Sequence, residues 1–507
     1  MNVRSGSIVL KTFMAINYAK IAVALALVLL ILPAVCTIQA ADTDNFYTQS
    51  LVPDAKILTI VPLQFDGVGA DELAMAVRSE QGGIRLLVYR ESIPRNYESK
   101  PALAVDVPAS VFGLQAVDLD GDNRTEIALL GLENLYVVDF DEGGFAAIPK
   151  ELAKFERLYA VPRPDFIVEY EFLFDLNNDR SFDAVLPSWD GIRIMKRDRT
   201  GFAAGRLVKI NHGSIANLGT NLLAPDASCG LAMTLPTIGA FDLNTDRAKD
   251  IVVASGSGLA VCFQVGDFQF AETPNQLLEV RAAFLDNLRF MSWGFGDLNS
   301  DKVTDYCRVF TQGSQDEFKT VIEIYLASGQ SGFAQRPSKR IVLDQYCVGL
   351  NVADLNGDGT AAAIVATVAV SSTSLVKSLL VKRMQVDLNV FLAEGGVLSE
   401  QASSIKRISC AVDFFGGDVP TRLVGCLHGD FDKDKMKELV SINDDDEIEI
   451  FKGAKSPQFS DKPMLIRQTQ RCNWLETSDL NLDGKADLIL HLVDETGRDL
   501  TTLLWSK

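Results

Sequence analysis

The chain has 507 residues, of which 47% are hydrophobic, 23% charged and 8% aromatic. This composition is typical of a folded globular protein and excludes disordered, collagen-like and coiled-coil classes. The formal net charge of -19 argues against a DNA or RNA partner, because nucleic-acid binding depends on Lys and Arg that displace counterions from phosphates.

The first predicted element is a secretory signal at residues 1–40. Three basic residues and no acidic one lie in this segment, and its apolar run at 21–35 is shorter than the roughly 20 residues of a membrane-spanning helix. We expect cleavage after Ala40, which takes the net charge from -19 to -22; an uncleaved anchor is the alternative. The mature chain, 41–507, is then secreted, periplasmic or on the cell surface, with no transmembrane span.

A short acidic stretch followed by an apolar one recurs eight times along the mature chain. The intervals between the starts are 54, 57, 67, 55, 57, 76 and 49 residues, which suits a repeating unit of four strands. Apolar runs flank each stretch, such as 112–117 before it and 135–138 after it, and predict strands. We therefore predict one all-β domain, in which small sheets stack radially as a β-propeller. The stretches start at Gln64, Asp118, Asp175, Asp242, Asp297, Asp354, Asp430 and Asp479.

The two ends of the mature chain indicate how the ring closes. After Asp479 we expect strands at 488–492 and 501–505, so the last repeat is one strand short. The segment 45–52 precedes the first repeat and has no other partner. We expect this segment to supply the missing outer strand, which gives eight blades; seven blades, without the degenerate first stretch, is the alternative.

Each acidic stretch places oxygen-bearing side chains at positions 1, 3, 5 and 9, numbered from its first residue. Closely spaced carboxylates repel one another without a cation, and hard oxygen ligands in a flexible loop are what Ca²⁺ prefers. Position 12, where a helical calcium loop carries a bidentate glutamate, is apolar at Leu129, Leu186, Val253 and Leu490. We therefore expect a strand after the loop and a structural role for the ion.

Six stretches keep all four ligand positions and two depart from the pattern. In the sixth stretch position 9 is Ala362, which predicts weaker binding. In the first stretch Gln64 and Val68 replace ligands, and we expect no metal there. The sequence thus predicts six or seven calcium sites. The expected ligands are Asp118, Asp120, Asp122, Glu126, Asp175, Asn177, Asp179, Asp183, Asp242, Asn244, Asp246, Asp250, Asp297, Asn299, Asp301, Asp305, Asp354, Asn356, Asp358, Asp430, Asp432, Asp434, Glu438, Asp479, Asn481, Asp483 and Asp487.

These repeats resemble the FG-GAP or VCBS repeats of integrin-alpha-like propellers over essentially all of residues 45–507. Phe112 and Gly113, five residues before Asp118, resemble the Phe-Gly of the repeat's name, although the Gly-Ala-Pro part is absent and most repeats lack both. The resemblance implies a calcium-bearing loop between the first two strands of each blade. It implies no activity, because propellers host binding modules and enzymes alike.

Cysteine and histidine form no evident reactive centre. Seven cysteines remain after removal of the signal, and Cys410 with Cys426 is the candidate disulfide. The three histidines are too few and too scattered for a metal site or a triad; we expect His428 and His491 to be core or loop residues, and His212 to be exposed. Buried thiols in strands are expected at Cys262, Cys307, Cys347 and Cys472.

Two function classes remain. We favour a non-catalytic binding or adhesion protein for a glycan or protein surface; the alternative is a polysaccharide-degrading enzyme, such as a lyase. The longest intervals contain insertions at 210–231, 371–384 and 411–425, and by the resemblance most of this extra length lies on the face opposite the acidic loops. These insertions either cover the central channel or bind the partner. The candidate contact residues are His212, Asn217, Asp226, Phe414 and Phe415.

Overall fold

The computed structural model describes residues 46–507 except 66, 68, 80–81, 142–143, 146–147, 159–166, 199–200, 212–213, 220–227, 234, 267, 281–287, 315–316, 371–382, 395–396, 412–424 and 456–457. The expected signal at 1–40 lies outside these residues. Thr43–Lys507 forms one compact unit. Strands are the only regular elements of the described part, which therefore contains no helix with the length and hydropathy of a membrane span.

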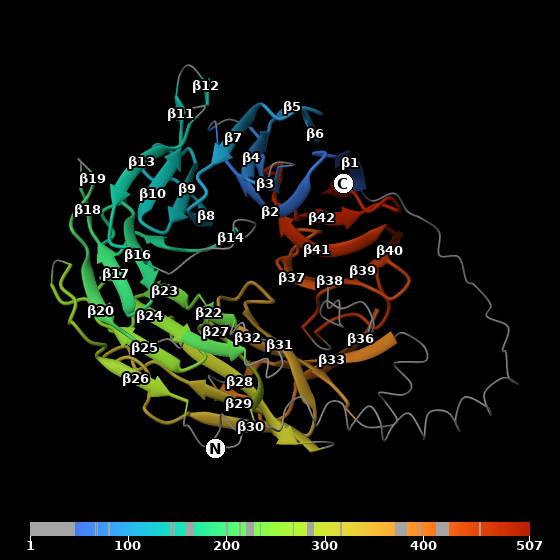
Figure 1. Cartoon of the computed structure of the whole chain (residues 1–507). Coiled ribbons are helices and arrows are strands. Elements are labelled where there is room, and N and C mark those ends of the chain that lie inside the picture. The colour runs from blue at the N-terminus through green and yellow to red at the C-terminus, as the bar shows by residue number, and fades with distance from the viewer. Residues whose placement is uncertain are drawn as a thin grey trace, which may run out of the picture. The chain divides into compact units, whose positions relative to one another are not determined.

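The strands form an eight-bladed β-propeller with four-stranded blades, as the sequence predicts (Figure 1). The four strands of a blade are antiparallel neighbours that follow one another from the centre of the ring to its rim. Blade 2 has an additional short strand, β14 (Val168–Glu169), which pairs in parallel with the innermost strand β8 (Val111–Val117).

The strands of the first four blades are given from the centre outward. Blade 1 contains β2 (Lys56–Leu63), β3 (Glu72–Arg78), β4 (Ile84–Tyr89) and β7 (Leu103–Val107). Blade 2 contains β8, β9 (Glu126–Gly131), β10 (Asn134–Val138) and β13 (Lys150–Lys154). Blade 3 contains β15 (Leu173–Phe174), β16 (Asp183–Ser188), β17 (Gly191–Met195) and β20 (Arg206–Lys209). Blade 4 contains β23 (Thr237–Phe241), β24 (Asp250–Ser255), β25 (Gly258–Cys262) and β26 (Gln276–Glu279).

The remaining four blades follow the same order. Blade 5 contains β27 (Leu288–Gly296), β28 (Asp305–Ser314), β29 (Glu317–Tyr325) and β30 (Lys339–Leu343). Blade 6 contains β31 (Tyr346–Ala353), β32 (Ala362–Val368), β33 (Arg383–Phe391) and β36 (Ser404–Ala411). Blade 7 contains β37 (Gly425–Gly429), β38 (Glu438–Ile442), β39 (Glu447–Phe451) and β40 (Leu465–Gln468). Blade 8 contains β41 (Arg471–Ser478), β42 (Asp487–Val493), β43 (Asp499–Ser506) and β1 (Phe46–Leu51).

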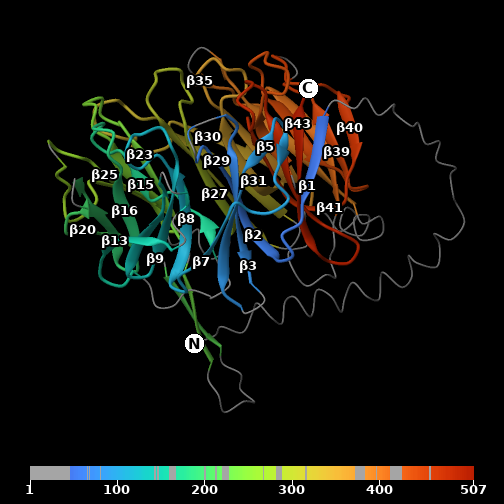
Figure 2. The same cartoon turned by 90° about the horizontal axis from the view of Figure 1, so that it is seen from above.

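Short hairpins extend both faces of the disc. Because neighbouring strands run in opposite directions, the connections between first and second and between third and fourth strands share one face, here called the loop face. Connections between second and third strands and between blades lie on the opposite face. The hairpin β21 (Ser214–Gly219) to β22 (Ser228–Met233) joins blades 3 and 4 and extends from the opposite face, in green at the lower side of Figure 2. On the loop face lie β5 (Glu91–Ile93) with β6 (Asn96–Tyr97), β11 (Phe140–Asp141) with β12 (Gly144–Phe145), β18 (Arg197–Asp198) with β19 (Gly201–Phe202), and β34 (Ala393–Glu394) with β35 (Val397–Leu398).

The ring is closed by β1, which completes blade 8 beside β43. The register runs antiparallel from Phe46 opposite Ser506 to Leu51 opposite Thr501. The side chain of Gln49 also donates to the carbonyl of Tyr97 in blade 1 and accepts from its backbone NH, both at 2.7 Å. The closing strand and the eight-blade count are therefore confirmed.

The apolar core lies between neighbouring sheets. Every residue of the second strands β9 and β24 is buried. Between blades 8 and 1, Leu503 and Trp505 belong to the same buried cluster as Leu73 and Met75. Burying a side chain of this size stabilises the folded state by roughly 1.5–3 kcal/mol, so each blade depends on its two neighbours.

The expected disulfide between Cys410 and Cys426 is wrong. Cys410 is a free, buried thiol on β36, the outer strand of blade 6, whereas Cys426 lies on β37, the inner strand of blade 7. The expectation of buried strand thiols is confirmed for Cys262, Cys307 and Cys347.

Candidate metal loops

Each acidic stretch forms the loop between the first and second strands of its blade, and an apolar side chain at position 2 anchors it. This side chain is buried in all eight loops. The sequence contains a signal for this anchor, because the second residue of every copy is Leu or Phe. The ligand pattern does not include it, since that pattern covers only positions 1, 3, 5 and 9. The eight anchors are Phe65, Leu119, Leu176, Leu243, Leu298, Leu355, Phe431 and Leu480.

All eight loops share an unusual backbone conformation, with positive φ at positions 4 and 6. In the first and sixth loops both positions are glycine, Gly67 with Gly69 and Gly357 with Gly359. Elsewhere ten non-glycine residues adopt this conformation, among them the β-branched Thr245 at φ +60°. A left-handed conformation costs an L-residue about 1–2 kcal/mol, so interactions within the loop must offset this cost.

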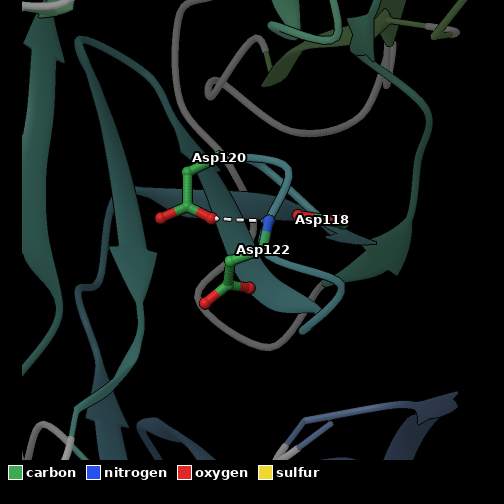
Figure 3. Close-up of side chains that lie close together, drawn as sticks. All are labelled: Asp118, Asp120 and Asp122. Carbon is green, nitrogen blue, oxygen red and sulfur yellow. Dashed lines mark hydrogen bonds between the residues drawn. The ribbon is translucent and has the colours of Figure 1, made fainter.

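The position-1 carboxylate organises the turn by accepting backbone hydrogen bonds. Oδ1 of Asp118 accepts from the NH of Gly121 at 2.7 Å, and Oδ2 accepts from the NH of Asn123 at 3.0 Å. Oδ1 of Asp120 then accepts from the NH of Asp122 at 3.2 Å (Figure 3). The other six loops that begin with Asp repeat the bond from position 6 to position 1 at 2.7 to 3.1 Å.

Carboxylates converge most closely in the second and seventh loops. In each of the sets Asp118, Asp120, Asp122 and Asp430, Asp432, Glu438, one oxygen per residue lies within 4.8 Å of the others. Two oxygens that bind one Ca²⁺ at 2.3–2.6 Å can be at most about 5.2 Å apart, so both sets fit a calcium ion. Oδ1 of Asp430 is buried and has no hydrogen-bond partner among the described residues. A bound cation would coordinate this oxygen.

Five other loops carry Asn at position 3, and in four of them its amide bridges to position 5. Nδ2 of Asn177 donates to Oδ2 of Asp179 at 2.8 Å. Asn244, Asn299 and Asn356 make the same bond at 2.9 to 3.0 Å. The structure therefore places positions 1, 3 and 5 side by side in these loops as well.

The position-9 carboxylate lies beneath the loop and ties it to the blade. Oδ2 of Asp487 accepts from the NH of Leu480 at position 2, at 3.0 Å, and Oδ1 accepts from the NH of Ser506 at the end of β43, at 2.8 Å. Asp250, Asp305 and Glu438 make both bonds too. Burial raises the pKa of these position-9 carboxyls, to about 6 in Asp183, Asp250 and Asp305 and to about 7 in Glu126, Glu438 and Asp487.

Cationic side chains that the pattern does not include approach three of the loops. Nζ of Lys452, which follows β39, contacts Asp432 and lies 3.2 Å from Oδ2 of Asp434. Nε of Arg124 donates to Oδ2 of Asp122 at 2.7 Å. Nη2 of Arg95 in blade 1 lies 3.5 Å from Oδ2 of Asp483 in the loop of blade 8. The sequence offers no signal for Lys452 and Arg95, because both come from outside the loops they approach.

Backbone hydrogen bonds join the loops of neighbouring blades. The NH of Ala486 at position 8 of the eighth loop donates to the carbonyl of Asp430 in the seventh, at 2.8 Å. The NH of Asp71 in the first loop donates to the carbonyl of Leu480 in the eighth, at 2.8 Å. Equivalent bonds join four further pairs of neighbours at 2.7 to 2.9 Å. The loops thus form a nearly continuous ring on the loop face.

The two degenerate loops keep the positive φ angles at positions 4 and 6 and lack some of the ligand side chains, as the sequence indicates. In the first loop the Gln64 amide donates to the carbonyl of Gly69 at 3.0 Å, within the turn that Asp carboxylates organise elsewhere. Asp66 and Val68 lie outside the described residues. In the sixth loop the buried Ala362 offers no ligand, while Asp354 still accepts from the NH groups of Gly357 and Gly359.

The candidate partner-binding residues lie largely beyond the described part of the chain. This holds for His212, Asp226, Phe414 and Phe415, and for the side chain of Asn217 on β21. The side chain of His428 is likewise not described. The topology places the described ends of all three insertions on the opposite face. His491 is a buried core residue stacked on Trp474, as expected.

Comparison with known proteins gives no family. No protein-family profile and no curated sequence matches the chain. Among solved structures, an Agrocybe aegerita lectin that recognises non-reducing terminal N-acetylglucosamine has 14% identity, covers 91% of this chain and 99% of its own, and gives a TM-score of 0.44. The V. cholerae biofilm matrix protein Bap1 has 12% identity, coverages of 90% and 88%, and a TM-score of 0.33. A putative 6-phosphogluconolactonase from Bacteroides fragilis has 12% identity, coverages of 85% and 99%, and a TM-score of 0.34. With TM-scores below 0.5, none of them transfers its ligand or activity to this chain.

Proposed function

We propose that this chain is a calcium-stabilised propeller of the FG-GAP or VCBS type, acting as a non-catalytic binding or adhesion protein outside the cytoplasm. The observation that carries the calcium proposal is the second and seventh loops, where three carboxylates approach one point within a backbone turn common to all eight loops. The buried, unpartnered Oδ1 of Asp430 supports it. Bound Ca²⁺ would supply positive charge to neighbouring carboxylates that otherwise repel one another.

The proposed ions are structural clips. Each would be held by the side-chain oxygens at positions 1, 3, 5 and 9, and position 9 also ties the loop to the third strand of its blade. Metal binding to the folded state alone stabilises that state by mass action. Since neighbouring loops are hydrogen-bonded to one another, we propose that calcium stabilises the whole ring of loops.

The proposed partner is a glycan or protein surface that binds on the opposite face. Insertions between strands carry function more often than the scaffold does, and the described ends of all three insertions lie on that face. The hairpin β21 to β22 extends it further (Figure 2). The expected signal at 1–40 supports a location outside the cytoplasm.

Counting metal ions tests the calcium proposal directly. The mature chain, purified without chelator, should contain six or seven calcium ions, and Asp120→Ala should contain one fewer. Asp66→Ala is the matched control, because Asp66 holds position 3 of the loop in which we expect no metal. Equal calcium content in all three proteins, or none in any, would contradict the proposal.

A glycan array and a pull-down from native extracellular material test the binding role. Trimming 411–425 or 210–231 to a tight turn should remove the captured partner and leave the calcium content unchanged. Retention of every captured partner by both trimmed variants would refute the assignment to the opposite face.

A further inference from the structure

A pocket of about 580 Å³ lies on the rim between blades 4 and 5. The outer strand β26 of blade 4 forms one side, and β28, β29, β30 and the connection before β30 form the other. Its polar lining includes Arg308, Glu323, Tyr325, Arg336 and Arg340. A pocket of this volume falls within the range that small-molecule ligands occupy.

Arg308 breaks the rule of its own repeat. It is position 12 of the fifth stretch, where six of the other copies have an apolar residue, such as Leu129, Leu186 or Val253, and the seventh has Ser441. Its side chain is nevertheless buried, with the residue 9% exposed. A buried charge costs free energy unless it is paired and hydrogen-bonded, and a residue that breaks the local rule indicates a functional site.

One edge of the Arg308 guanidinium is fully engaged and the other is not. Nε donates to Oε2 of Glu323 at 2.8 Å, and Nη2 donates to the hydroxyl of Tyr325 at 2.7 Å. The Tyr325 hydroxyl in turn donates to Oε2 of Glu323 at 2.9 Å. Nη1 is buried and has no hydrogen-bond partner in the part of the chain that the structure describes. The network therefore fixes the guanidinium and leaves one buried donor group without an acceptor among the described residues.

The lining of the pocket is more basic than the chain as a whole. Three arginines face two glutamates, Glu279 and Glu323, along its lining, so the pocket carries a net positive charge on a chain of net charge -19. Arg340 lies 3.8 Å from Glu323, and Arg336 is exposed at the edge. The side chains that line the pocket therefore carry no excess of negative charge that would repel a carboxylate.

The remaining lining is apolar on one side and polar at the rim. Leu277, Phe310 and Pro337 provide apolar contact surface, and Leu277 is 49% exposed. Glu279 and Gln335 provide an acceptor and an amide at the edge. A sugar ring has a C–H face for the first surface and hydroxyls for the second, whereas a peptide carboxyl terminus needs backbone partners along its length.

We infer that this rim pocket binds a sugar that carries a carboxylate, of the uronic-acid type. The carboxylate takes the hydrogen bond of Arg308 Nη1, assisted by the charge of Arg336, and the ring contacts the apolar side. The inference rests on the proposed binding function and specifies one of its ligands. It adds a site on the rim that is separate from both the acidic loops and the opposite face.

Titration calorimetry with two matched monosaccharides tests the inference. The calcium-loaded mature chain should bind sodium D-glucuronate at least about tenfold more tightly than D-glucose, since a charge-assisted hydrogen bond is lost with the carboxylate. Arg308→Leu, which introduces the apolar residue type found at this position in most other repeats, should weaken glucuronate binding by about tenfold or more. Arg336→Ser changes only an exposed side chain and should weaken binding about threefold, with a smaller effect at high salt. Arg85→Ser, an exposed arginine paired with Asp106 in blade 1, is the matched control and should bind as the parent does.

Four outcomes overturn the inference. They are no glucuronate binding by the parent, equal binding of glucuronate and glucose, unchanged glucuronate binding in both Arg308→Leu and Arg336→Ser, and binding of N-acetylated peptide carboxylates in place of glucuronate. If one of these outcomes occurs while the parent still captures a neutral glycan or a protein on the opposite face, the inference fails and the proposed function stands. If the parent captures no glycan and no protein at all, the proposed function itself fails.

Discussion

The backbone NH of Ser506 donates to Oδ1 of Asp487 at 2.8 Å, and this bond ties the end of the last strand to the loop that opens the last blade. Oδ2 of the same carboxylate holds Leu480 within the loop. Position 9 is thus both a proposed metal ligand and a buried support of the blade. These two roles can be separated by experiment.

Asp487→Ala should destabilise the protein even when calcium is absent. The substitution leaves two buried NH groups without acceptors, and each costs about 1–3 kcal/mol. Urea denaturation in excess chelator near pH 5.5, below the pKa of about 7 to which burial raises the Asp487 carboxyl, should therefore show a loss of roughly 2–4 kcal/mol in the free energy of unfolding.

Asp483→Ala is the control for that experiment. The Asp483 side chain, at position 5 of the same loop, is 31% exposed, whereas Asp487 is fully buried. The control variant should have little effect in chelator and should remove the stabilisation that added calcium gives to the eighth loop. Equal losses for the two variants in chelator would mean that position 9 has no role apart from the metal.

The pH dependence of stability should change sign with calcium. Burial raises the pKa of the position-9 carboxyls to about 6 in Asp250 and about 7 in Glu438, compared with about 4 in an unfolded chain. Between these values the metal-free folded protein binds more protons than the unfolded chain, so its stability falls as pH rises.

In chelator, the melting temperature should accordingly be higher at about pH 5.5 than at about pH 7.5. In saturating calcium it should be higher at the upper pH, because calcium needs ionised carboxylates. Scanning calorimetry at several pH values distinguishes the two cases, and parallel curves with and without calcium would refute the assignment.

Deletion of residues 41–54 should open the ring. It removes β1, so β43 becomes an exposed edge strand, which invites aggregation. The contact of Gln49 with Tyr97 is lost as well. Light scattering and thermal melts should show aggregation and a lower melting temperature. A shorter deletion of 41–45, which retains β1, should behave as the parent; equal behaviour of both truncations would contradict closure by β1.

Lys452→Met should raise the calcium affinity of the seventh loop. The ammonium group contacts Asp432 and Asp434 and competes with a cation for the same carboxylates. Lys485→Met is the control, because Lys485 instead contacts the carbonyl of Lys507. Hydrogen exchange of the peptide that covers 430–438, followed against calcium concentration, should show a shift of severalfold to lower calcium for Lys452→Met alone. An unchanged midpoint would mean that Lys452 does not compete with the ion.

The parts of the fold that repeat could be predicted from the sequence, because each copy confirms the others. The acidic loops, the strands on either side and the eight blades follow from spacing, and the closing strand follows from an otherwise unpaired segment at 45–52. The wrong disulfide was inferred from closeness in sequence. In the fold, Cys410 and Cys426 belong to opposite edges of two different blades.

Contacts between repeats were beyond reach of the sequence, because they depend on how one blade is placed against the next. Arg95 shows this for the metal loops: it belongs to blade 1, and its Nη2 lies 3.5 Å from Oδ2 of Asp483 in the loop of blade 8. Arg308 shows it for the rim pocket. A pattern averaged over eight copies hides a copy that departs from it, and the pocket needs β26 of the preceding blade.

The antiparallel register of β1 and β43 has a mechanical consequence. Phe46 lies opposite Ser506, so the first and last residues of the closing pair are at the same end of it. Tension applied between these two ends loads one hydrogen-bonded pair at a time and peels the strands apart, whereas a load along the strands in opposite directions would stretch all the bonds together. The force needed to separate β1 from β43 should therefore be smaller when the pull is between Phe46 and Ser506 than when it is directed along the two strands.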